Sequence, residues 1–593
     1  MFDRDFLLRV GLYRTIVVGL FLILIGNLFL MMIARHSEYK EQALENRQDR
    51  FRVRAPRGRI FDRDGTLLAS NLYIADIIVP KGTLTAAGPD TTLDRLITWF
   101  GLPREETVAR LRGQKIKGGR LVLVSNATMA QISAVEERGR QLPGVRVIAR
   151  TRRSYMLGQL FAHVIGYVGE VGKADLDTTG DWSGYQLGDS KGKQGLEAAM
   201  ESELRGESGV KLEEVNASGR VVGREPVWLQ DVVPGRDVTL SLSVQMQQVM
   251  AEALGDRPGC GVALSVKTGE VLAAFSNPSF DPNIMTVSIS AEQWGLLVND
   301  PAKPFFNRVI QATYPPASLY KPVTSLAALY HHQVGRESEL EPCLGGWSFG
   351  NRYFRCWKHS GHGNVNHQSA IVNSCDTFFY QLALNLDIDQ LAAAARSFGL
   401  GSTTTRLFSD EAAGNVPDSA WYDKRFGAGR WTRGVLLNNA IGQGELLVTP
   451  IQMAVLAGRL ASSGRMPNPE FVLSPIQPIS RPASLPFREV NLAWVRGALL
   501  ETVSTGTGKE AIVDGVAVAG KTGTAQNPHG DDHAWFMCFA PAENPEVAMA
   551  VVVENAGNGS SEAAPVAHVW LKAYFTRTGL LKPAPVDSLG AGS

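Results

Sequence analysis

The chain has 593 residues, 44% of them hydrophobic, and its 59 Lys and Arg residues nearly balance its 58 Asp and Glu residues. This length predicts several domains rather than one. The balanced charge argues against the strongly basic surface that is typical of nucleic-acid-binding proteins, so we expect no nucleic-acid partner.

An apolar segment near the N-terminus predicts a membrane anchor. Residues 15–33 carry no charge and are long enough to cross a bilayer. No small-residue cleavage site follows, because Ala34-Arg35-His36 leads directly into charged residues, so we interpret the segment as a retained anchor. Basic residues before it favour a cytoplasmic N-terminus with the bulk of the chain outside. We place a cytoplasmic segment at residues 1–14 and the transmembrane anchor at residues 15–35.

Residues 36–235 are predicted to form a non-catalytic domain of mixed α/β structure. The charged residues 37–55 indicate a helical stalk that leaves the membrane. An Asp-Gly pair at positions 64–65 lies between two apolar runs, which predicts a β-hairpin. The segment 195–205 predicts a helix, and Gly206 ends it. We find no catalytic constellation in this region.

Residues 236–578 are predicted to form a second, compact domain. Two apolar runs within residues 261–275 flank a Thr-Gly turn and predict a hairpin. Residues 533–540 and 547–553 predict a further strand pair, and the helices fall mainly between the two pairs. This order is typical of an α+β domain in which helices cover an antiparallel sheet. The tail, residues 579–593, is rich in Pro, Gly, Ala and Ser, and we expect it to be disordered.

The sequence Ser318-Leu-Tyr-Lys321 is the first candidate for chemistry. Residues three apart on a helix share one face, with Cβ atoms about 5–6 Å apart, so the lysine amine can reach the serine hydroxyl. Pro315 and Pro316 favour an extended approach, which puts Ser318 at or near a helix N-terminus. A serine is a poor nucleophile until a neighbour removes its proton, and a lysine can do so only when it is neutral. Burial and a nearby cation both lower an amine's pKa, so the pair predicts another cation across the site.

Taken alone, this pair could be an ordinary helix cap followed by a solvated lysine. Two further motifs argue against that interpretation, namely Ser374-Cys-Asp376 and Lys521-Thr-Gly-Thr524. The latter follows small and β-branched residues at 516–520, which predict a strand. Such a strand could supply the second cation and an edge on which a peptide docks. The three motifs in this order are the signature of penicillin-binding proteins and class A β-lactamases.

On these motifs the chain resembles the class B penicillin-binding proteins, which are peptidoglycan D,D-transpeptidases. The resemblance also rests on Arg57-Gly-Arg-Ile-Phe-Asp-Arg63, Gly195-Leu-Glu197, Asn307-Arg308, Tyr314-Pro-Pro316, Gly442-Gln-Gly444, Thr449-Pro450 and Lys521–Gln526. The segment Trp357–Gly363 and the Ser-x-Asp form of the second motif are similar to the branch of the family that serves cell elongation. The resemblance implies one transmembrane helix, a pedestal or dimerisation domain over residues 36–235, and a serine β-lactamase-like transpeptidase domain.

The resemblance also implies roles for the motif residues. Ser318 would attack the penultimate D-alanine carbonyl of a stem pentapeptide, Lys321 would take its proton, and Ser374 would relay a proton to or from an amine. The substrate-binding residues would be Asp376, Lys521, Thr522, Gly523 and Thr524. Asp376 departs from the commoner Asn, because an ionised Asp only accepts hydrogen bonds whereas an Asn also donates. Ala317 also departs, since Gly is common before the nucleophile.

The partners implied by the resemblance are stem peptides on lipid-linked or nascent glycan strands, β-lactams, a membrane-embedded glycan polymerase and proteins of the elongation complex. The expected location is the inner (cytoplasmic) membrane, with the catalytic domain on its outer side. Alternatives stay open at this point: a transpeptidase specific to division, a β-lactam sensor or resistance protein, and a scaffold that activates a membrane polymerase.

A cluster of metal-ligating residue types lies beside the second motif. Thiolate, imidazole and carboxylate groups together suit tetrahedral zinc, and the predicted ligands are Glu341, Cys356, His362 and Cys375. Some relatives in the resembled family carry acidic, His and Cys ligands in this region. Two other interpretations compete, because Cys343 and Cys356 could form a disulfide outside the cytoplasm, and free cysteines are often small buried hydrophobes.

Overall fold

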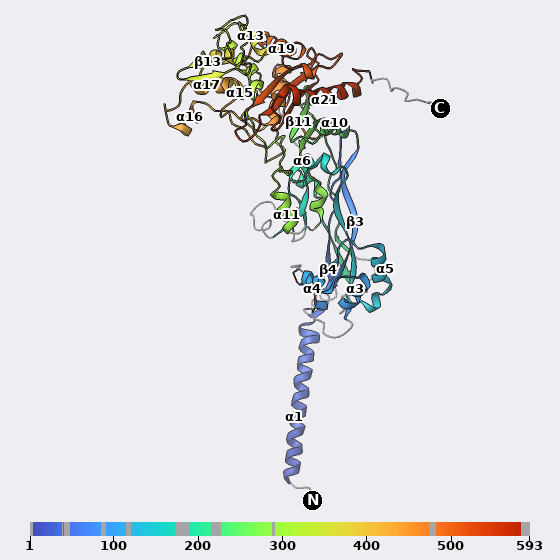
Figure 1. Ribbon diagram of the computed structural model, residues 1–593. Helices are drawn as coiled ribbons and strands as arrows, with labels where there is room; N and C mark the ends of the chain where they lie inside the picture. The colour runs from blue at the N-terminus through green and yellow to red at the C-terminus, as the bar shows by residue number, and fades with distance from the viewer. Residues whose placement is uncertain are drawn as a thin grey trace, which may run out of the picture. The chain divides into compact units, whose positions relative to one another are not determined.

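The computed structural model describes residues 4–582 except 38, 41–47, 85–90, 114–119, 173–183, 186–188, 215–226, 288–290 and 474–481. The chain divides into two compact units (Figure 1). The first contains Met1–Arg57, Leu72–Arg152 and Arg205–Gly235, and the second contains Gly58–Asn71, Arg153–Leu204 and Arg236–Ser593. Most of the tail predicted to be disordered, residues 583–593, lies outside the described residues.

The N-terminal helix α1 (Arg4–Phe29) continues into a short π-helical turn (Leu30–Ala34). The 26 residues from Leu8 to Ile33 are long and apolar enough to cross a membrane, and they are not buried within the protein. At a rise of about 1.5 Å per residue they span about 39 Å, which exceeds the ~30 Å hydrocarbon core of a bilayer. The helix therefore covers most of the predicted anchor.

The first unit contains an antiparallel sheet of three strands in the order β1–β8–β9. Their bounds are Gln48–Val53 for β1, Gly209–Glu214 for β8 and Val227–Gln230 for β9. The prediction of a helical stalk over residues 37–55 is wrong for Gln48–Val53. These residues pair with β8 along their whole length, and this long-range pairing outweighs the local charge pattern on which the prediction rested.

The remainder of the first unit packs around a small apolar core. The C-terminal part of β3 (Leu67–Pro80) pairs with β4 (Arg120–Val124), and Ile77 lies opposite Val124. Three helices surround this pair, namely α3 (Thr92–Phe100), α4 (Arg104–Gly113) and α5 (Met129–Glu137). The core they share includes Ile77, Val79, Leu96, Leu111, Leu121, Leu123 and Val135.

The second unit is built on an antiparallel sheet of five strands in the order β12–β11–β17–β16–β15. The bounds are β11 Gly259–Ser265, β12 Val271–Asn277, β15 Ala519–Ala525, β16 His533–Ala540 and β17 Val547–Val553. The predicted hairpin and the predicted strand pair are both confirmed. The predicted strand that carries the third motif is β15, which begins at Ala519 rather than at residue 516. It is an edge strand, so one side of its backbone is unpaired in the sheet.

Helices cover both faces of this sheet, which confirms the α+β prediction. Successive residues of β17 enter different cores: Val551 packs with α10 (Val244–Leu254) and α21 (Ala564–Arg577), whereas Val552 packs with α12 (Lys321–Tyr330) and α18 (Pro450–Ala461). This alternation follows from the two-residue period of a strand. The core that includes α12 and α18 supports the candidate site, because Lys321 is the first residue of α12.

The other elements of the second unit are short. The predicted helix over residues 195–205 is divided at Met200 into α8 (Gly195–Ala199) and α9 (Glu201–Leu204). The predicted hairpin around Gly65 is confirmed, because β2 (Ile60–Phe61) pairs with the start of β3. The remaining bounds are α6 Ala162–Ile165, β6 Val168–Glu170, β7 Ser190–Gly192, β10 Val238–Thr239, α11 Ala291–Val298, β13 Gly346–Phe349, β14 Arg352–Arg355, α13 His367–Val372, α14 Asp376–Ala383, α15 Ile388–Ser397, α16 Ser419–Phe426, α17 Gly434–Ala440, α19 Glu489–Ser504 and α20 Gly559–Glu562.

Candidate functional site

The predicted nucleophile lies where a helix begins. Ala317–Tyr320 form a 3-10 turn, η6, that runs directly into α12. This is the position near a helix N-terminus that the two prolines predict. The Ser318 side chain is half-buried, and its hydroxyl makes no hydrogen bond within the described part of the chain. Its oxygen is therefore available to an incoming carbonyl carbon.

The peptide before Ser318 is held by a close backbone approach. Ala317 has φ +52°, a left-handed conformation that costs an L-residue about 1–2 kcal/mol. Its N–H donates to the Gly442 carbonyl oxygen at 2.7 Å. A Cβ atom on Gly442 would lie 2.1 Å from the Ala317 carbonyl oxygen, so only glycine fits there. The Gly442-Gln-Gly444 segment thus fixes the conformation of the residue that precedes the nucleophile.

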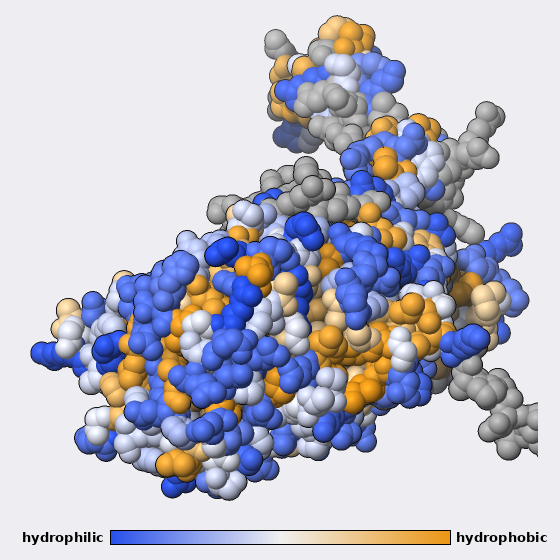
Figure 2. Space-filling model, turned by 90° about the horizontal axis from the view of Figure 1, so that it is seen from above, coloured by the Kyte–Doolittle hydropathy of each residue, from blue (hydrophilic) through white to orange (hydrophobic). Residues whose placement is uncertain are grey.

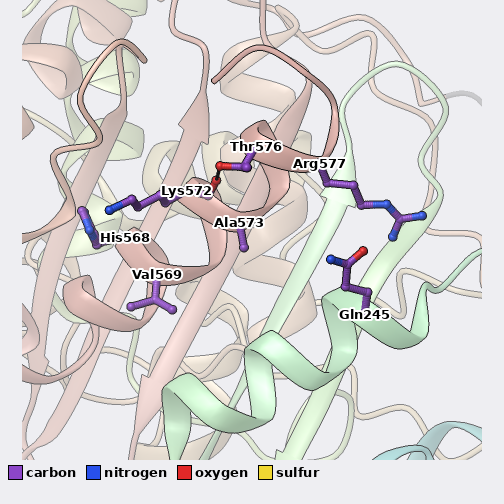
Figure 3. Close-up of a pocket in the computed structure, with 7 residues that line it drawn as sticks. All are labelled: Gln245, His568, Val569, Lys572, Ala573, Thr576 and Arg577. Carbon is purple, nitrogen blue, oxygen red and sulfur yellow. Dashed lines mark hydrogen bonds between the residues drawn. The ribbon is translucent and has the colours of Figure 1, made fainter. Parts of the chain in front are cut away.

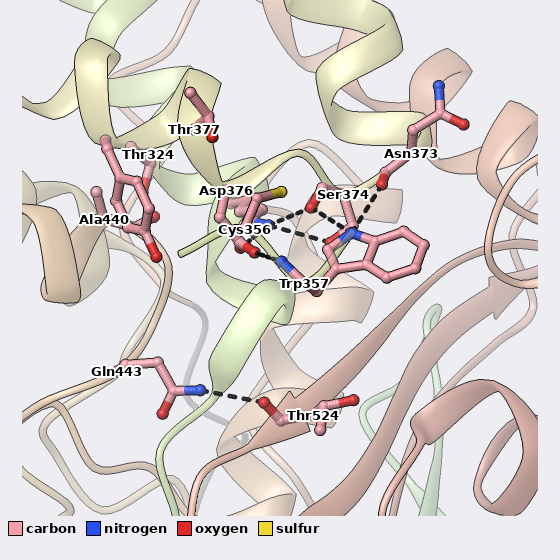
Figure 4. A network of polar contacts seen from close by, with 12 residues as sticks. Thr324, Cys356, Trp357, Asn373, Ser374, Asp376, Thr377, Ala440, Gln443 and Thr524 are labelled. Atoms are coloured by element: carbon pink, nitrogen blue, oxygen red, sulfur yellow. Dashed lines mark hydrogen bonds and ion pairs between the residues drawn. The ribbon is translucent and has the colours of Figure 1, made fainter. Parts of the chain in front are cut away.

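Lys321 is fully buried and is hydrogen-bonded to the second motif. Its Nζ donates to the Ser374 carbonyl oxygen at 2.8 Å, to Ser374 Oγ at 3.1 Å and to Asp376 Oδ1 at 2.7 Å. An ammonium group has three N–H donors, and here each has an acceptor. The first and second motifs therefore form one polar constellation, part of which is labelled in Figure 4.

Ser374 reaches this constellation because of the turn between two helices. Asn366 caps the first, α13, and Cys375 is the residue before the second, α14. Ser374 lies between them with φ +56°, a conformation that non-glycine residues rarely adopt. Such strain is maintained only where the surroundings fix it, and it directs Ser374 and Asp376 toward the same lysine.

Both carboxylate oxygens of Asp376 are bound within the protein. Oδ1 accepts from Lys321, and Oδ2 accepts from the backbone N–H of Trp357 at 2.9 Å. The Trp357 indole Nε1 donates in turn to the carbonyl oxygens of Asn373 and Ser374 (Figure 4). Each carboxylate oxygen can still accept a further hydrogen bond, so the substrate contact of Asp376 stays a prediction.

The third motif supplies the predicted second cation. Lys521 is fully buried in β15, and its Nζ donates to the Thr522 carbonyl oxygen at 3.1 Å. Burial lowers the pKa of Lys521 well below its ordinary value, and the positive charge of the nearby Lys321 lowers it further. A Cβ atom on Gly523 would lie 2.5 Å from Leu319 Cδ1, so this glycine lets β15 approach η6 closely. Thr524 is exposed beside that contact.

Two residues that sequence reasoning gave no role also belong to the site. Gln443 Nε2 donates to the Thr524 carbonyl oxygen at 3.1 Å and so ties the Gly-Gln-Gly segment to β15 (Figure 4). Thr507 Oγ1 lies 2.8 Å from Thr522 Oγ1. Gln443 stands inside a motif that the sequence analysis noted, which was a usable signal, whereas no sequence signal indicated Thr507.

Four metal-ligating side chains meet beside the second motif. The ligand atoms of Cys343, Cys356, His362 and Cys375 all lie within 4.8 Å of one another. His362 Nδ1 lies 3.6 Å from Sγ of both Cys343 and Cys356. Ligand atoms around tetrahedral zinc lie about 3.3–3.8 Å apart when the bonds are about 2.0–2.3 Å long. The donor set therefore fits a tetrahedral zinc ion.

The predicted ligand set needs one correction. Glu341 lies outside this group, and its Oε2 accepts a hydrogen bond from the Trp347 indole at 2.9 Å. Cys343 takes the fourth position instead, because the pairing of Cys343 with Gly363 brings its thiol to His362. The alternative Cys343–Cys356 disulfide is not formed, since all five cysteines are free and buried.

The thiols in this cluster differ from isolated buried cysteines. The hydrogen bond from Cys375 lowers the pKa of Cys356 well below its ordinary value, and the same contact raises the pKa of Cys375. Burial opposes ionisation of Cys343, but hydrogen bonds from Thr377 and nearby backbone groups lower its pKa overall. Thiolates are the form in which cysteine binds metals.

A separate cavity of about 550 Å³ lies between α10 and α21 (Figure 3). Its lining includes Gln245, His568, Lys572 and Arg577, and none of the three motifs contributes to it. Seen from above, hydrophilic residues cover much of the visible face of the molecule, with hydrophobic groups between them (Figure 2). We therefore locate the chemistry at the motif constellation and not at this cavity.

Two known sequence families match this chain, one nearer its N-terminus and one nearer its C-terminus. The family described as "Penicillin binding protein transpeptidase domain" matches residues 259–572. The family described as "Penicillin-binding Protein dimerisation domain" matches residues 52–240. The transpeptidase match alone covers more than half of the chain.

Curated relatives and solved structures agree with these matches. The chain is 33% identical to the peptidoglycan D,D-transpeptidase MrdA of Haemophilus influenzae over 92% of this chain and 88% of that protein. It is 32% identical to MrdA of Escherichia coli K12 over 89% of this chain and 88% of that protein. The Helicobacter pylori PBP2 in complex with MreC is similar with a TM-score of 0.80 and 27% identity, over 90% of this chain and 99% of that one. Pseudomonas aeruginosa PBP2 in complex with WCK 5153 has a TM-score of 0.68 and 30% identity, over 89% and 97%.

Proposed function

The chain belongs to the class B penicillin-binding proteins, and from that membership we propose that it cross-links peptidoglycan stem peptides through an acyl-enzyme on Ser318 during cell-wall elongation. The observation that carries the proposal is the buried constellation of Lys321, Ser374 and Asp376 between the candidate nucleophile and a second buried lysine, Lys521. This arrangement supplies a nucleophile, a proton acceptor, a proton relay and a cation for the substrate.

Acylation begins when Ser318 Oγ attacks the carbonyl of the penultimate D-alanine. The neutral amine form of Lys321, in which one position of Nζ is a lone pair rather than an N–H, accepts the hydroxyl proton. The hydrogen bond between Lys321 and Ser374 Oγ then provides a route by which a proton reaches the departing D-alanine amine. Lys521 and Thr522 hold the terminal carboxylate at the open edge of β15. The N–H groups of Ser318 and Thr524 stabilise the oxyanion, since η6 and β15 meet at Gly523.

Deacylation uses the same groups in reverse. An amine from a neighbouring strand attacks the ester carbonyl, a C–N bond forms, and the bond between the carbonyl carbon and Ser318 Oγ breaks. The amine's proton passes through Ser374 and Lys321 to Ser318 Oγ, which restores the hydroxyl. A penicillin acylates Ser318 by the same first step, because its strained amide offers an equivalent carbonyl.

Mass spectrometry of protein labelled with penicillin tests the proposal. We expect a label on Ser318 that persists for many minutes, and no label in Ser318→Ala protein. A label that disappears within seconds would indicate a β-lactamase. Absence of any label on folded wild-type protein would refute an assembled acyl-transfer site.

We propose zinc as the resident metal of the cluster formed by Cys343, Cys356, His362 and Cys375. The fit of the donor set and the approach of His362 Nδ1 to 3.6 Å from two thiols support this proposal. A zinc ion there would brace the site, because Cys375 adjoins Ser374 and Asp376 in the chain. Its chemistry would be structural, since four protein ligands leave no open position.

Metal analysis of dialysed protein tests the zinc proposal. We expect about one equivalent of zinc in the wild type, a strong loss in Cys343→Ser protein, and retention in Glu341→Gln protein as the matched control. Less than a tenth of an equivalent in the wild type would refute a zinc site. Equal loss in both variants would refute the ligand set.

We propose that α1 anchors the protein in the inner membrane with its N-terminus in the cytoplasm and the second unit outside. A related PBP2 was solved in complex with MreC, and another similar structure concerns "coordination of polymerization and crosslinking by a peptidoglycan synthase complex". These related complexes support a membrane-embedded glycan polymerase and elongation-complex proteins as partners. Co-purification with such a polymerase should survive Ser318→Ala, and its loss on this change alone would argue against separable roles.

A further inference from the structure

The outer face of the β13–β14 hairpin is exposed directly beside the catalytic constellation. The two strands pair antiparallel, with Gly346 opposite Arg355 and Phe349 opposite Arg352. Strand residues alternate between faces, and Phe354 turns inward to pack against Tyr380. Tyr353 and Arg355 therefore share the outer face, and both are exposed.

Two exposed aromatic rings lie on and just after β14, Tyr353 on the outer face and Trp357 two residues beyond the end of the strand. The Tyr353 ring lies across Gly346, where a Cβ atom would approach its Cζ to 2.5 Å, so the glycine makes room for the ring. Tyr353 remains 54% exposed and Trp357 remains 56% exposed. An exposed aromatic ring whose position is already fixed offers apolar contact area to a ligand, and little conformational entropy is lost when the ligand binds. The apolar C–H faces of sugar rings are suitable partners for such rings.

Positive charge surrounds these rings. The segment from Leu344 to Gly363 contains Arg352, Arg355 and Lys358 but no Asp or Glu. All three cations are exposed, and none has an ion-pair partner among the described residues. Arg355 shares the outer face with Tyr353, and Lys358 follows Trp357 directly. Exposed rings and unpaired cations therefore alternate along this segment, which suits a ligand that carries both sugars and carboxylates.

The face is continuous with the reacting groups. The Trp357 indole donates to the Ser374 carbonyl oxygen at 3.0 Å, and its backbone N–H donates to Asp376 (Figure 4). Ser374 Oγ is hydrogen-bonded to Lys321. A chain that lies on Trp357 would therefore bring its amine to the group that we assign to proton relay.

We propose that the outer face of the hairpin, with Tyr353 and Arg355, together with the exposed Trp357 and Lys358 that follow β14, binds the acceptor strand, meaning the second stem peptide with its attached sugars. The inference rests on the proposed function and deepens it. The donor's carboxylate occupies Lys521 and Thr522 on β15, so the acceptor needs a different surface. Each stem peptide ends in a carboxylate, which Arg355 and Lys358 attract, while the sugar rings stack on Tyr353 and Trp357.

The test separates acceptor binding from donor chemistry. Full-length protein in detergent is first acylated with penicillin, which fills the donor site and reports an assembled Ser318. A labelled soluble disaccharide-tetrapeptide is then titrated against it. We expect the dissociation constant to rise at least tenfold in the double variant Arg355→Glu, Lys358→Glu, and the wild-type affinity to fall as salt is added.

Two further variants control the result. Lys572→Glu makes the same substitution on an exposed lysine of α21 (Figure 3) and should leave the affinity within about twofold of wild type. Tyr353→Ala should weaken the disaccharide-tetrapeptide more than it weakens a sugar-free peptide. Unchanged affinity in the hairpin double variant, or an equal loss in Lys572→Glu, would overturn the inference. Failure of penicillin to acylate the wild type would instead overturn the proposed function.

Discussion

Replacement of Gly442 by alanine should damage the site through one backbone contact. The new Cβ atom would lie 2.1 Å from the Ala317 carbonyl oxygen and 2.8 Å from its nitrogen, and neither atom belongs to a flexible side chain. Gly442 also has φ +74°, where an L-residue loses about 1–2 kcal/mol. Relief of the clash would break the 2.7 Å hydrogen bond from Ala317, which is worth about 1 kcal/mol. Together these losses reach about 2–3 kcal/mol.

The functional loss should arise from displacement of the nucleophile as well as from lost stability. Ser318 follows Ala317 directly, and a displacement of about 1 Å at a reacting group can cost about a hundredfold in rate. We therefore expect the second-order rate constant for acylation of Gly442→Ala protein by labelled penicillin to fall about a hundredfold. Stopped-time gel fluorescence measures that rate, and chemical denaturation measures the free energy of unfolding.

Gly444→Ala is the matched control within the same motif. Gly444 has φ +79°, so an alanine there would carry similar backbone strain. Its Cβ atom would make only ordinary contacts, with Asn438 Cβ at 3.4 Å and Asn439 Nδ2 at 4.0 Å. We expect a similar loss of about 1–2 kcal/mol from backbone strain with less than about a tenfold loss of acylation rate. Equal acylation rates in the two variants would refute the reasoning that the close approach positions the nucleophile.

Three more predictions concern the ion pair of Lys321 with Asp376, the buried His367 and the proposed zinc site. Asp376→Ala should lower the free energy of unfolding by about 3 kcal/mol, because it leaves the buried Lys321 without its carboxylate, and denaturant titration would measure this loss. Burial lowers the pKa of His367 to about 4 from 6.5, so below pH 6.5 only the unfolded state takes up this proton, and stability should fall by about 3 kcal/mol as the pH drops toward 4. His367→Gln should flatten that pH dependence in thermal melts. A chelator should lower the melting temperature of wild type but not of Cys343→Ser protein.

The sequence predicted the site where the chemistry restricts the residue types. A serine, a lysine three residues later and a second lysine on a strand have few alternative explanations, and the structure brings Lys321 and Ser374 together. The hairpin and the strand pair of the second unit were predictable because long apolar runs flank clear turns. These features depend on local patterns, which a sequence displays directly.

The remaining features depend on partners far away in the chain. Gln48–Val53 looked helical by charge, but its partner strand β8 lies about 160 residues later and no local pattern reveals it. Glu341 and Cys343 are two residues apart, so sequence alone could not tell which one reaches His362. The sequence pattern also gave no sign that the backbone N–H of Trp357 donates to the second oxygen of Asp376.

The strand order of the second unit has a consequence for how the protein is made. β11 lies between β12, its neighbour in the chain, and β17, which is synthesised about 280 residues later. Ser318 emerges long before Lys521, so the nascent chain holds a nucleophile without its second cation. Strand pairing over such sequence distances makes folding slow, because the entropy of loop closure is lost before the stabilising contacts form. Cross-linking competence should therefore arise only after the last strands have left the ribosome, in a single late step of biogenesis.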